Sequence, residues 1–214
     1  MDRFGRIFAA IAAVFVWAVL LTELVLAVTA PQDGLGAAAA LGRYVSSFTI
    51  LANLFAAVAL AAVAFDPHRA ARANILTAIL LYLTVVALVY LLEFHGALET
   101  KAGGLRMLLD AAIHDIVPAL YLVFWLFLPK GTLGWRAPFA WLAFPLAYLV
   151  FMLVQGALTG HYAYPFLDLA ALGAGRVAIN SLGLLGIYLV VGFVLAGIDC
   201  ALGGLPRRLP AASG

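Results

Sequence analysis

Six apolar runs, each about 20 residues long, account for most of this chain of 214 residues. An α-helix of about this length crosses the hydrocarbon core of a bilayer. Hydrophobic residues make up 66% of the chain and charged residues 10%, against about a quarter charged in soluble domains. The runs are Ile7 to Val28, Tyr44 to Phe65, Asn74 to Phe94, Arg106 to Leu128, Pro138 to Leu158 and Arg176 to Ile198. The sequence therefore predicts an all-α, multi-pass membrane protein with six transmembrane helices in one bundle.

Residues 1–214 are predicted to form a single domain, because the connections Asp66 to Ala73 and Pro129 to Ala137 are short and no repeat is visible. The first run differs from a signal peptide. It is too long for the apolar region of one, it contains Glu23, and Pro31 directly follows the small residues at its end. We expect it to be retained as a membrane span.

The basic residues predict the orientation. With a cytoplasmic N-terminus, eight Lys and Arg residues lie on the cytoplasmic side and four on the other, as the positive-inside rule requires. The eight are Arg3, Arg6, Arg69, Arg72, Lys130, Arg136, Arg207 and Arg208. Both termini are therefore predicted to be cytoplasmic, with the protein in the cytoplasmic membrane. The outer connections are then Thr29 to Arg43, His95 to Leu105 and Thr159 to Gly175.

Several classes of function are disfavoured by what the sequence lacks. A net charge of +2 without a basic run gives no electrostatic surface for nucleic acid. The single cysteine, Cys200, forms no internal disulfide and belongs to no zinc or iron–sulfur spacing. The chain contains no dinucleotide fingerprint, P-loop, HExxH or haem-attachment motif. We therefore predict no cofactor and no metal, and expect membrane lipids to be the partners.

Polar residues gather in the outer halves of the spans, above all in "SSFTILANL" (Ser46 to Leu54) and "LLDAAIHDIVP" (Leu108 to Pro118). At 1.5 Å per residue, Thr49 and Glu23 lie roughly 8 Å and His114 roughly 12 Å below the outer ends of their spans. The same halves contain Asn53, Asp110, Asp115, Gln155 and Asn180. Titratable groups at such depth are costly and suggest a functional site.

Helical spacing predicts which of these side chains face one another. Ser46, Thr49 and Asn53 are expected to share one face, at positions i, i+3 and i+7. Asp110 and His114 share another face, one turn apart, so Asp110 is expected to bond the imidazole.

Two further features of the fourth span follow from its sequence. Asp115 points about 100° away from His114 and is expected to face a neighbouring helix. Pro118 has no N–H for the carbonyl of His114, which predicts a kinked or hydrated helix at the histidine.

Thr49 and His114 suggest a reaction centre. A threonine hydroxyl needs a base within about 2.6 to 3.2 Å, and a neutral histidine is the usual base. The two residues are 65 positions apart, so only packing of the second span against the fourth would join them. Threonines that bond their own backbone, and histidines or asparagines that link helices, explain the same residues without chemistry. Metal binding by His114, Asp110 and Asp115 is disfavoured, because the carboxylates lie on different faces.

Three segments carry a resemblance to a known family: "SSFTILANL", "IHDIVPALYLVFWLFLPKGTLGW" and "GHYAYPFLDL". They resemble the bacterial six-helix branch of the androgen-induced, androgen-dependent membrane protein family, and the likeness extends over most of the chain. Animal members hydrolyse fatty acid esters of hydroxy fatty acids with an intramembrane threonine and histidine. The resemblance implies that Thr49 is the nucleophile and His114 the base. "YPFL", at Tyr164 to Leu167, also matches the animal proteins.

A mechanism can be drawn from these residues as a hypothesis. An acyl ester enters from the outer leaflet, Thr49 attacks its carbonyl, and His114 first accepts the proton and then returns it to the leaving alcohol. Asp110 would orient the imidazole, and Asn53 or Ser46 would donate to the oxyanion. Glu23 and Asp115 are further candidates for residues that support Thr49 and His114.

The outer loop before the sixth span is expected either to cover the site or to anchor the chain at the membrane surface, the usual role of interfacial tyrosines. The candidate lid consists of Tyr164, Pro165, Phe166 and Asp168. A pairing of Asp168 with Arg176 would make Asp168 structural.

Other classes of function explain the same sequence. A transporter needs polar groups along a path to both faces, and the nearly apolar inner halves of the spans argue against one. A non-enzymatic scaffold, with Thr49 and His114 as interhelical hydrogen-bond partners, stays open. So does a protein that binds a small apolar ligand in the same cavity.

Overall fold

The computed structural model describes residues 1–31, 34–94 and 104–204, without the side chains of Glu93 and Phe94. Most of the predicted outer connection His95 to Leu105 lies outside the described residues, as do Arg207 and Arg208. In the described part the chain is helical and has no β-strand. Its elements are α1 (Arg3–Thr29), α2 (Ala37–Ser46), α3 (Phe48–Phe65), η1 (Pro67–Ala71), α4 (Ala73–Phe94), α5 (Leu105–Ala111), η2 (Ala112–Ile116), α6 (Val117–Leu126), α7 (Ala137–Trp141), α8 (Ala143–Thr159), η3 (Pro165–Leu167) and α9 (Leu169–Gly203).

Six helical stretches of the described chain are long and apolar enough to cross a membrane. They are Arg3–Thr29, Phe48–Phe65, Ala73–Leu92, Leu105–Leu126, Ala137–Thr159 and Leu169–Gly203. These stretches confirm six long apolar helices at the positions of the six predicted runs. Most bounds differ from their predictions by one to five residues; Phe65 is the same in both, and the sixth stretch begins seven positions earlier.

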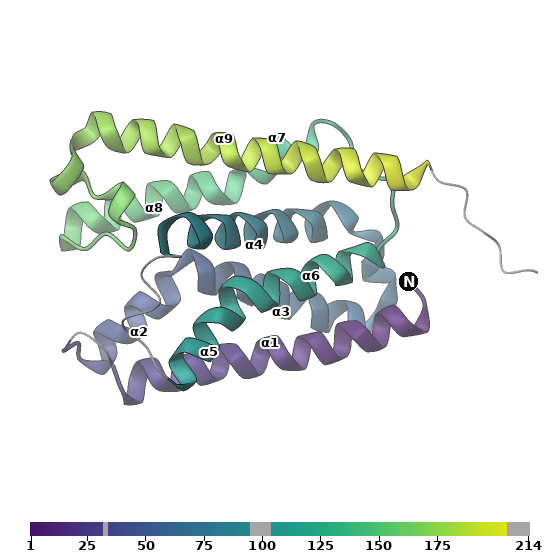
Figure 1. Ribbon diagram of the computed structural model, residues 1–214, viewed down its shortest axis with the longest axis horizontal. Helices are drawn as coiled ribbons and strands as arrows, with labels where there is room; N and C mark the ends of the chain where they lie inside the picture. Colours follow the sequence, from purple (N-terminus) through teal and green to yellow (C-terminus); the bar gives the residue numbers. More distant parts are fainter. Residues whose placement is uncertain (32–33, 95–103, 205–214) are drawn as a thin grey trace, which may run out of the picture.

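The helices lie side by side along the long axis of the molecule (Figure 1). The start of α1 and the end of α9 lie at one end of the bundle, called here the terminal end. The opposite end carries α2, the start of α5 and the end of α8. If each of the six helices crosses a membrane, the start of α1 and the end of α9 lie on the same side of it. The prediction that this side is cytoplasmic stays a prediction.

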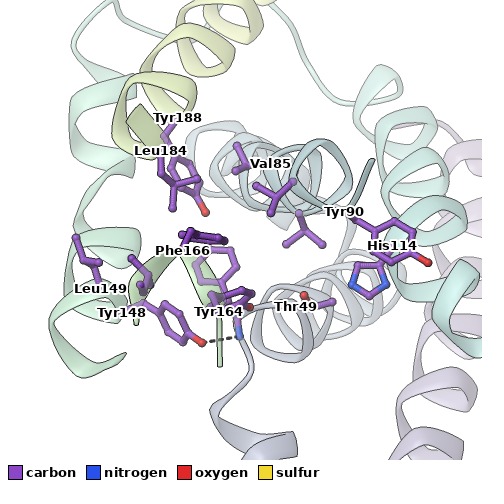
Figure 2. A pocket seen from close by; sticks show the side chains of 14 residues that line it. Thr49, Val85, Tyr90, His114, Tyr148, Leu149, Tyr164, Phe166, Leu184 and Tyr188 are labelled. Carbon is purple, nitrogen blue, oxygen red and sulfur yellow. Dashed lines mark hydrogen bonds between the residues drawn. The ribbon is translucent and has the colours of Figure 1, made fainter. Parts of the chain in front are cut away.

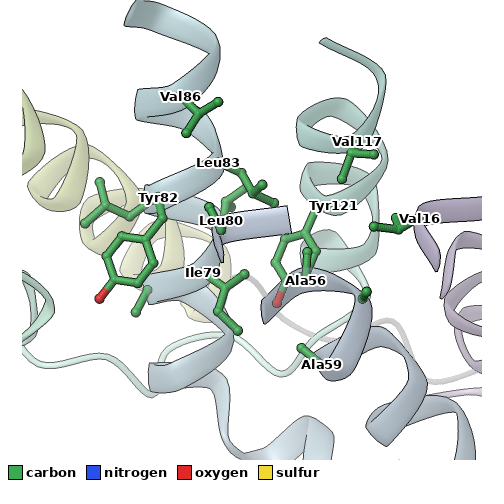
Figure 3. Packing of buried hydrophobic residues seen from close by; sticks show 14 of the residues in the cluster. Val16, Ala56, Ala59, Ile79, Leu80, Tyr82, Leu83, Val86, Val117 and Tyr121 are labelled. Atoms are coloured by element: carbon green, nitrogen blue, oxygen red, sulfur yellow. The ribbon is translucent and has the colours of Figure 1, made fainter. Parts of the chain in front are cut away.

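The core is built around α3 and α4, which pack against α1, α6 and α9. Alanines at Ala52, Ala56 and Ala59 are buried on α3 and allow the neighbouring helices to approach closely. Figure 3 shows Tyr121 of α6 directed toward Ala56, with the α4 side chains on the other side. Tyr121 is fully buried. This packing fixes α3 and α4, which flank the candidate site, and α6, which continues the fourth span beyond it.

The predicted second span is interrupted, because α2 ends at Ser46 and α3 begins at Phe48. Between them Ser47 is extended, with φ −71° and ψ 130°. The expectation that Ser46 shares a helical face with Thr49 and Asn53 is therefore wrong. Tyr148 of α8 gives the physical reason: its hydroxyl accepts from the amide of Phe48 at 3.0 Å and donates to the carbonyl of Ser46 at 2.8 Å. In a continuous helix, the amide of Phe48 and the carbonyl of Ser46 would instead bond backbone groups of the same helix.

The fourth span changes its winding at the histidine. Residues Ala112–Ile116 form a π-helical turn between α5 and α6, directly before Pro118. A proline deprives the turn before it of one backbone donor, and π-turns inside α-helices are frequent at functional sites. The predicted disturbance at His114 is thus present, as a wider turn.

Candidate functional site

A small cavity of about 80 Å³ lies among α3, α4, η2, α8, η3 and α9. Thr49 and His114, predicted from the sequence as a pair, both line it (Figure 2). The polar lining is formed by Thr49, Tyr90, His114, Tyr148, Tyr164 and Tyr188, and the remaining lining side chains are aliphatic or phenyl. We call this cavity the Thr49–His114 cavity, and the part of the bundle around it the cavity end.

Thr49 occupies the first turn of α3, two residues after the extended Ser47. Its side chain is buried, with 8% of its surface exposed. In a helix that begins at Phe48, the amides of Thr49 and Ile50 have no acceptor one turn earlier inside the helix. The helix break therefore leaves these two backbone N–H groups free of intrahelical acceptors at the positive end of α3, in the same turn as the hydroxyl.

His114 lies in the π-turn and is held from two sides. Its Nδ1 lies 3.0 Å from the carbonyl oxygen of Asp110 and 3.3 Å from the Oδ1 atom of that residue. The ring of Tyr90 stacks on the imidazole, with centroids 4.0 Å apart and planes within 9°. A carbonyl oxygen only accepts, so Nδ1 carries the proton and Nε2 is the basic nitrogen of the neutral ring.

Tyr90 also fixes Asp110, because its hydroxyl donates to the Oδ2 atom of that carboxylate. The two carboxylate oxygens thus contact different partners, Tyr90 and His114. Glu23 of α1 lies near Arg106, Asp110 and His114. The imidazole therefore belongs to a connected group of polar side chains from α4 and the fourth span, with Glu23 nearby.

Asn53 is fully buried, but it is not among the residues that line the cavity. Its amide nitrogen donates to the carbonyl of Thr49 at 2.8 Å and to that of Ile113 at 3.1 Å. With both protons used in this way, Asn53 links α3 to the π-turn and positions the two candidate residues. Ser46 bonds the carbonyl of Arg43 at 3.3 Å.

The remaining predicted residues lie in varied places. Asp115 is exposed and does not line the cavity. Asp168 is the N-cap of α9, where its Oδ1 accepts from the amides of Ala170 at 2.9 Å and Ala171 at 3.0 Å. Of the candidate lid, Tyr164 and Phe166 line the cavity, whereas Pro165 is exposed.

Tyr164 is the polar group of the lid. Burial raises the pKa of its hydroxyl, and hydrogen bonds with Thr49 and Tyr148 act in the opposite direction. The hydroxyl therefore stays protonated at neutral pH and can serve as a hydrogen-bond donor beside Thr49.

Sequence reasoning missed Tyr90, Tyr148 and Tyr188. Each lies on an apolar helix where a tyrosine is unremarkable, and the contacts of Tyr148 join positions about 100 residues apart. Spacing along one helix carries no signal for such contacts. Among the described residues, no group of three or more His, Cys, Asp or Glu side chains is placed to bind a metal ion.

Comparison of the chain with protein-family models, with curated proteins and with solved structures found no match.

Proposed function

We propose that the protein is a membrane-embedded hydrolase of lipid acyl esters, with Thr49 as nucleophile and His114 as general base. One observation carries the proposal: two residues from different helices line the same cavity, and the imidazole is fixed through Nδ1 by Asp110. A nucleophile, a base and a group that orients the base are the three parts that such catalysis needs.

The proposed reaction runs in two halves. In the first, the Thr49 Oγ attacks the ester carbonyl carbon as its proton passes to Nε2 of His114. The tetrahedral intermediate then expels the alcohol oxygen, which takes that proton, and leaves an acyl-threonine. In the second half His114 accepts a proton from water, the hydroxide attacks the acyl carbon, and the proton returns to Thr49 as the acid is released.

The developing oxyanion needs hydrogen-bond donors aimed at it. We assign this role to the first-turn amides of Thr49 and Ile50, together with the Tyr164 hydroxyl. The positive end of α3 favours negative charge at this position. Asn53 and Ser46 leave the proposal as donors, because the amide protons of Asn53 go to two carbonyls and Ser46 lies before the helix break.

The experiment is fluorophosphonate labelling of the purified, folded protein. An activated hydroxyl attacks the phosphorus and displaces fluoride, which leaves a stable adduct that peptide mapping locates. We expect labelling at Thr49, and a loss of about 100-fold or more in Thr49→Ala and in His114→Ala, the usual scale of general-base catalysis. Thr49→Ser should keep part of the labelling.

The matched control is Thr84→Ala. Thr84 is a partly buried threonine of α4 whose hydroxyl bonds the carbonyl of Leu80 at 2.8 Å. This variant should be labelled like the wild type. Labelling that persists in a folded Thr49→Ala variant, or a folded wild type that is not labelled, would overturn the proposal in favour of a ligand-binding or scaffold protein.

A further inference from the structure

The Thr49–His114 cavity is too small for a whole lipid. Its volume is about 80 Å³, whereas pockets that bind small molecules usually measure about 300 to 1,000 Å³. The ester group of a substrate would fit beside Thr49 and His114, but a hydrocarbon chain would not. The chain of such a ligand therefore needs a second space that adjoins the cavity.

A second space of suitable size lies between α4 and α9. This α4–α9 groove has a volume of about 360 Å³. It shares three lining residues with the cavity: Val89, Phe166 and Leu184. The same three apolar side chains thus form the wall between the two spaces, and Figure 2 shows two of them, Phe166 and Leu184, beside the cavity.

We propose that the α4–α9 groove binds the aliphatic chain of a lipid ligand, and that Phe166 is the gate between the groove and the Thr49–His114 cavity. The inference rests on the proposed function for what happens in the cavity, but chain binding in the groove can be tested without it. The ligand class is an amphiphile with a long hydrocarbon chain.

The lining of the groove supports this chemistry. It is aliphatic on both helices, with Leu92 on α4 and Ile179 and Ile187 on α9. The polar member, Asn180, donates its amide nitrogen to the carbonyl of Phe166 at 2.8 Å. An apolar groove on a helix bundle that spans a bilayer opens toward lipid tails, so a chain can enter sideways without crossing water.

The same hydrogen bond suits Phe166 to act as a gate. Asn180 fixes the backbone of η3 to α9, so that movement is left to the Phe166 ring. That ring is partly buried and packs at an angle against Tyr164, with centroids 5.4 Å apart. A rotation of the ring about its side-chain bonds would join the two spaces while η3 stays in place.

Glycines on α9 offer a matched pair of test variants. Gly183 lines the groove, and a Cβ atom built there meets no atom within 4 Å. Gly197 has equally open surroundings on the same helix, close to the terminal end. Tryptophan at Gly183 should fill the groove, whereas tryptophan at Gly197 should leave it empty.

The first readout is the binding of cis-parinaric acid, a fluorescent fatty acid, to the detergent-purified protein. We expect Gly183→Trp to weaken saturable binding by about tenfold, which corresponds to the lost burial of about two methylenes. Gly197→Trp should bind like the wild type. Equal binding by the two folded variants would overturn the groove assignment.

The second readout compares long-chain with ethyl fluorophosphonate. Gly183→Trp should lower the rate of long-chain labelling much more than that of ethyl labelling, and Phe166→Ala should raise the ratio of long-chain to ethyl labelling. If each substitution changed the labelling by both probes equally, the proposed role of Phe166 as a gate would be overturned. A folded wild type that neither probe labels, but that binds parinarate with the expected dependence on Gly183, would refute the hydrolase and keep the groove.

Discussion

The two ends of the bundle both bury charged or titratable groups, but they use them differently. At the terminal end the carboxylate of Asp199 is 1% exposed. Its Oδ2 accepts from three successive amides, those of Gly131, Thr132 and Leu133, at 2.9, 3.0 and 3.1 Å. At the cavity end His114 has Nδ1 against Asp110, and its ring lines an open space that Thr49 also lines.

The difference teaches which buried polar groups suggest chemistry. The acceptor Oδ2 of Asp199 is directed at a loop backbone, so Asp199 fastens the end of α9 to the loop before α7. Lys130 beside it donates to the carbonyls of Trp125 and Leu128 and lies 4.0 Å from the centre of the Trp125 ring. A buried carboxylate whose oxygen accepts from three loop amides serves structure. A buried group with a side turned to a cavity has room for a ligand.

The largest effect on stability is expected at the terminal end. Asp199→Ala removes the buried carboxylate and leaves the amides of Thr132 and Leu133 without their acceptor, whereas the amide of Gly131 keeps the main-chain carbonyl of residue 199. It should lower the free energy of unfolding by about 3 kcal/mol. The matched control, Asp168→Ala, removes an exposed carboxylate that caps the other end of α9 and should cost about 1 kcal/mol. Denaturant titration of the purified variants measures both. Equal losses would contradict the contrast, as would a folded Asp199→Ala variant that has lost fluorophosphonate labelling.

A smaller effect is expected at the helix break before Thr49. Tyr148→Phe removes the hydroxyl that bonds both Ser46 and Phe48, at a cost of about 1 to 2 kcal/mol in unfolding free energy. It should also slow labelling, because the start of α3 is no longer fixed. Tyr82→Phe removes another buried hydroxyl, which donates to the carbonyl of Trp141 at 2.8 Å. It should cost about 1 kcal/mol in stability and leave the rate of labelling as it is. Equal rates of labelling in the two variants would show that the helix break at Ser47 has no special role in positioning Thr49.

The smallest effect concerns pH at the terminal end. Burial lowers the pKa of Lys130 to about 8, and Asp199 opposes part of this shift. The pKa of lysine in the unfolded chain is about 10.4, so above about pH 8 the unfolded state binds more protons and stability rises with pH. Because Lys130 is only half-buried, screening by solvent limits the size of this gain in stability. We expect the unfolding temperature to rise by about 1 to 2 °C between about pH 7.5 and 9.5, and to stay flat in Lys130→Met. A rise that persists in Lys130→Met would assign it to another group.

The sequence predicted the six long apolar helices well, because hydrophobic length is a local property. It also predicted that Asp110 and His114 would face each other, since residues one helical turn apart are neighbours even where the turn becomes π-helical. The expectation that Thr49 and His114 would meet came from their similar depths and from the family resemblance. The structure has both in one cavity, while their catalytic roles stay a prediction.

The break at Ser47 could not be predicted from the sequence, because serines inside an apolar run are compatible with a continuous helix. The break depends on Tyr148, a partner about 100 positions away. Asp199 was missed for a similar reason. It follows the sixth apolar run, where a carboxylate is expected to be solvated, and its burial depends on the loop at Gly131 to Leu133.

The π-turn at Ala112–Ile116 makes the number of residues in the fourth span important as well as their identity. A π-turn contains one residue more than the α-helical turn that it replaces, and each residue of an α-helix advances the direction of the side chains by about 100°. Deletion of one residue from this turn would restore a regular α-helix and rotate α5, with Asp110, by about that angle relative to α6. Asp110 would then turn away from Tyr90 of α4, whose hydroxyl now donates to its carboxylate, without any change of side chain at either position. Insertions and deletions ahead of Pro118 are therefore the changes that this site would tolerate least.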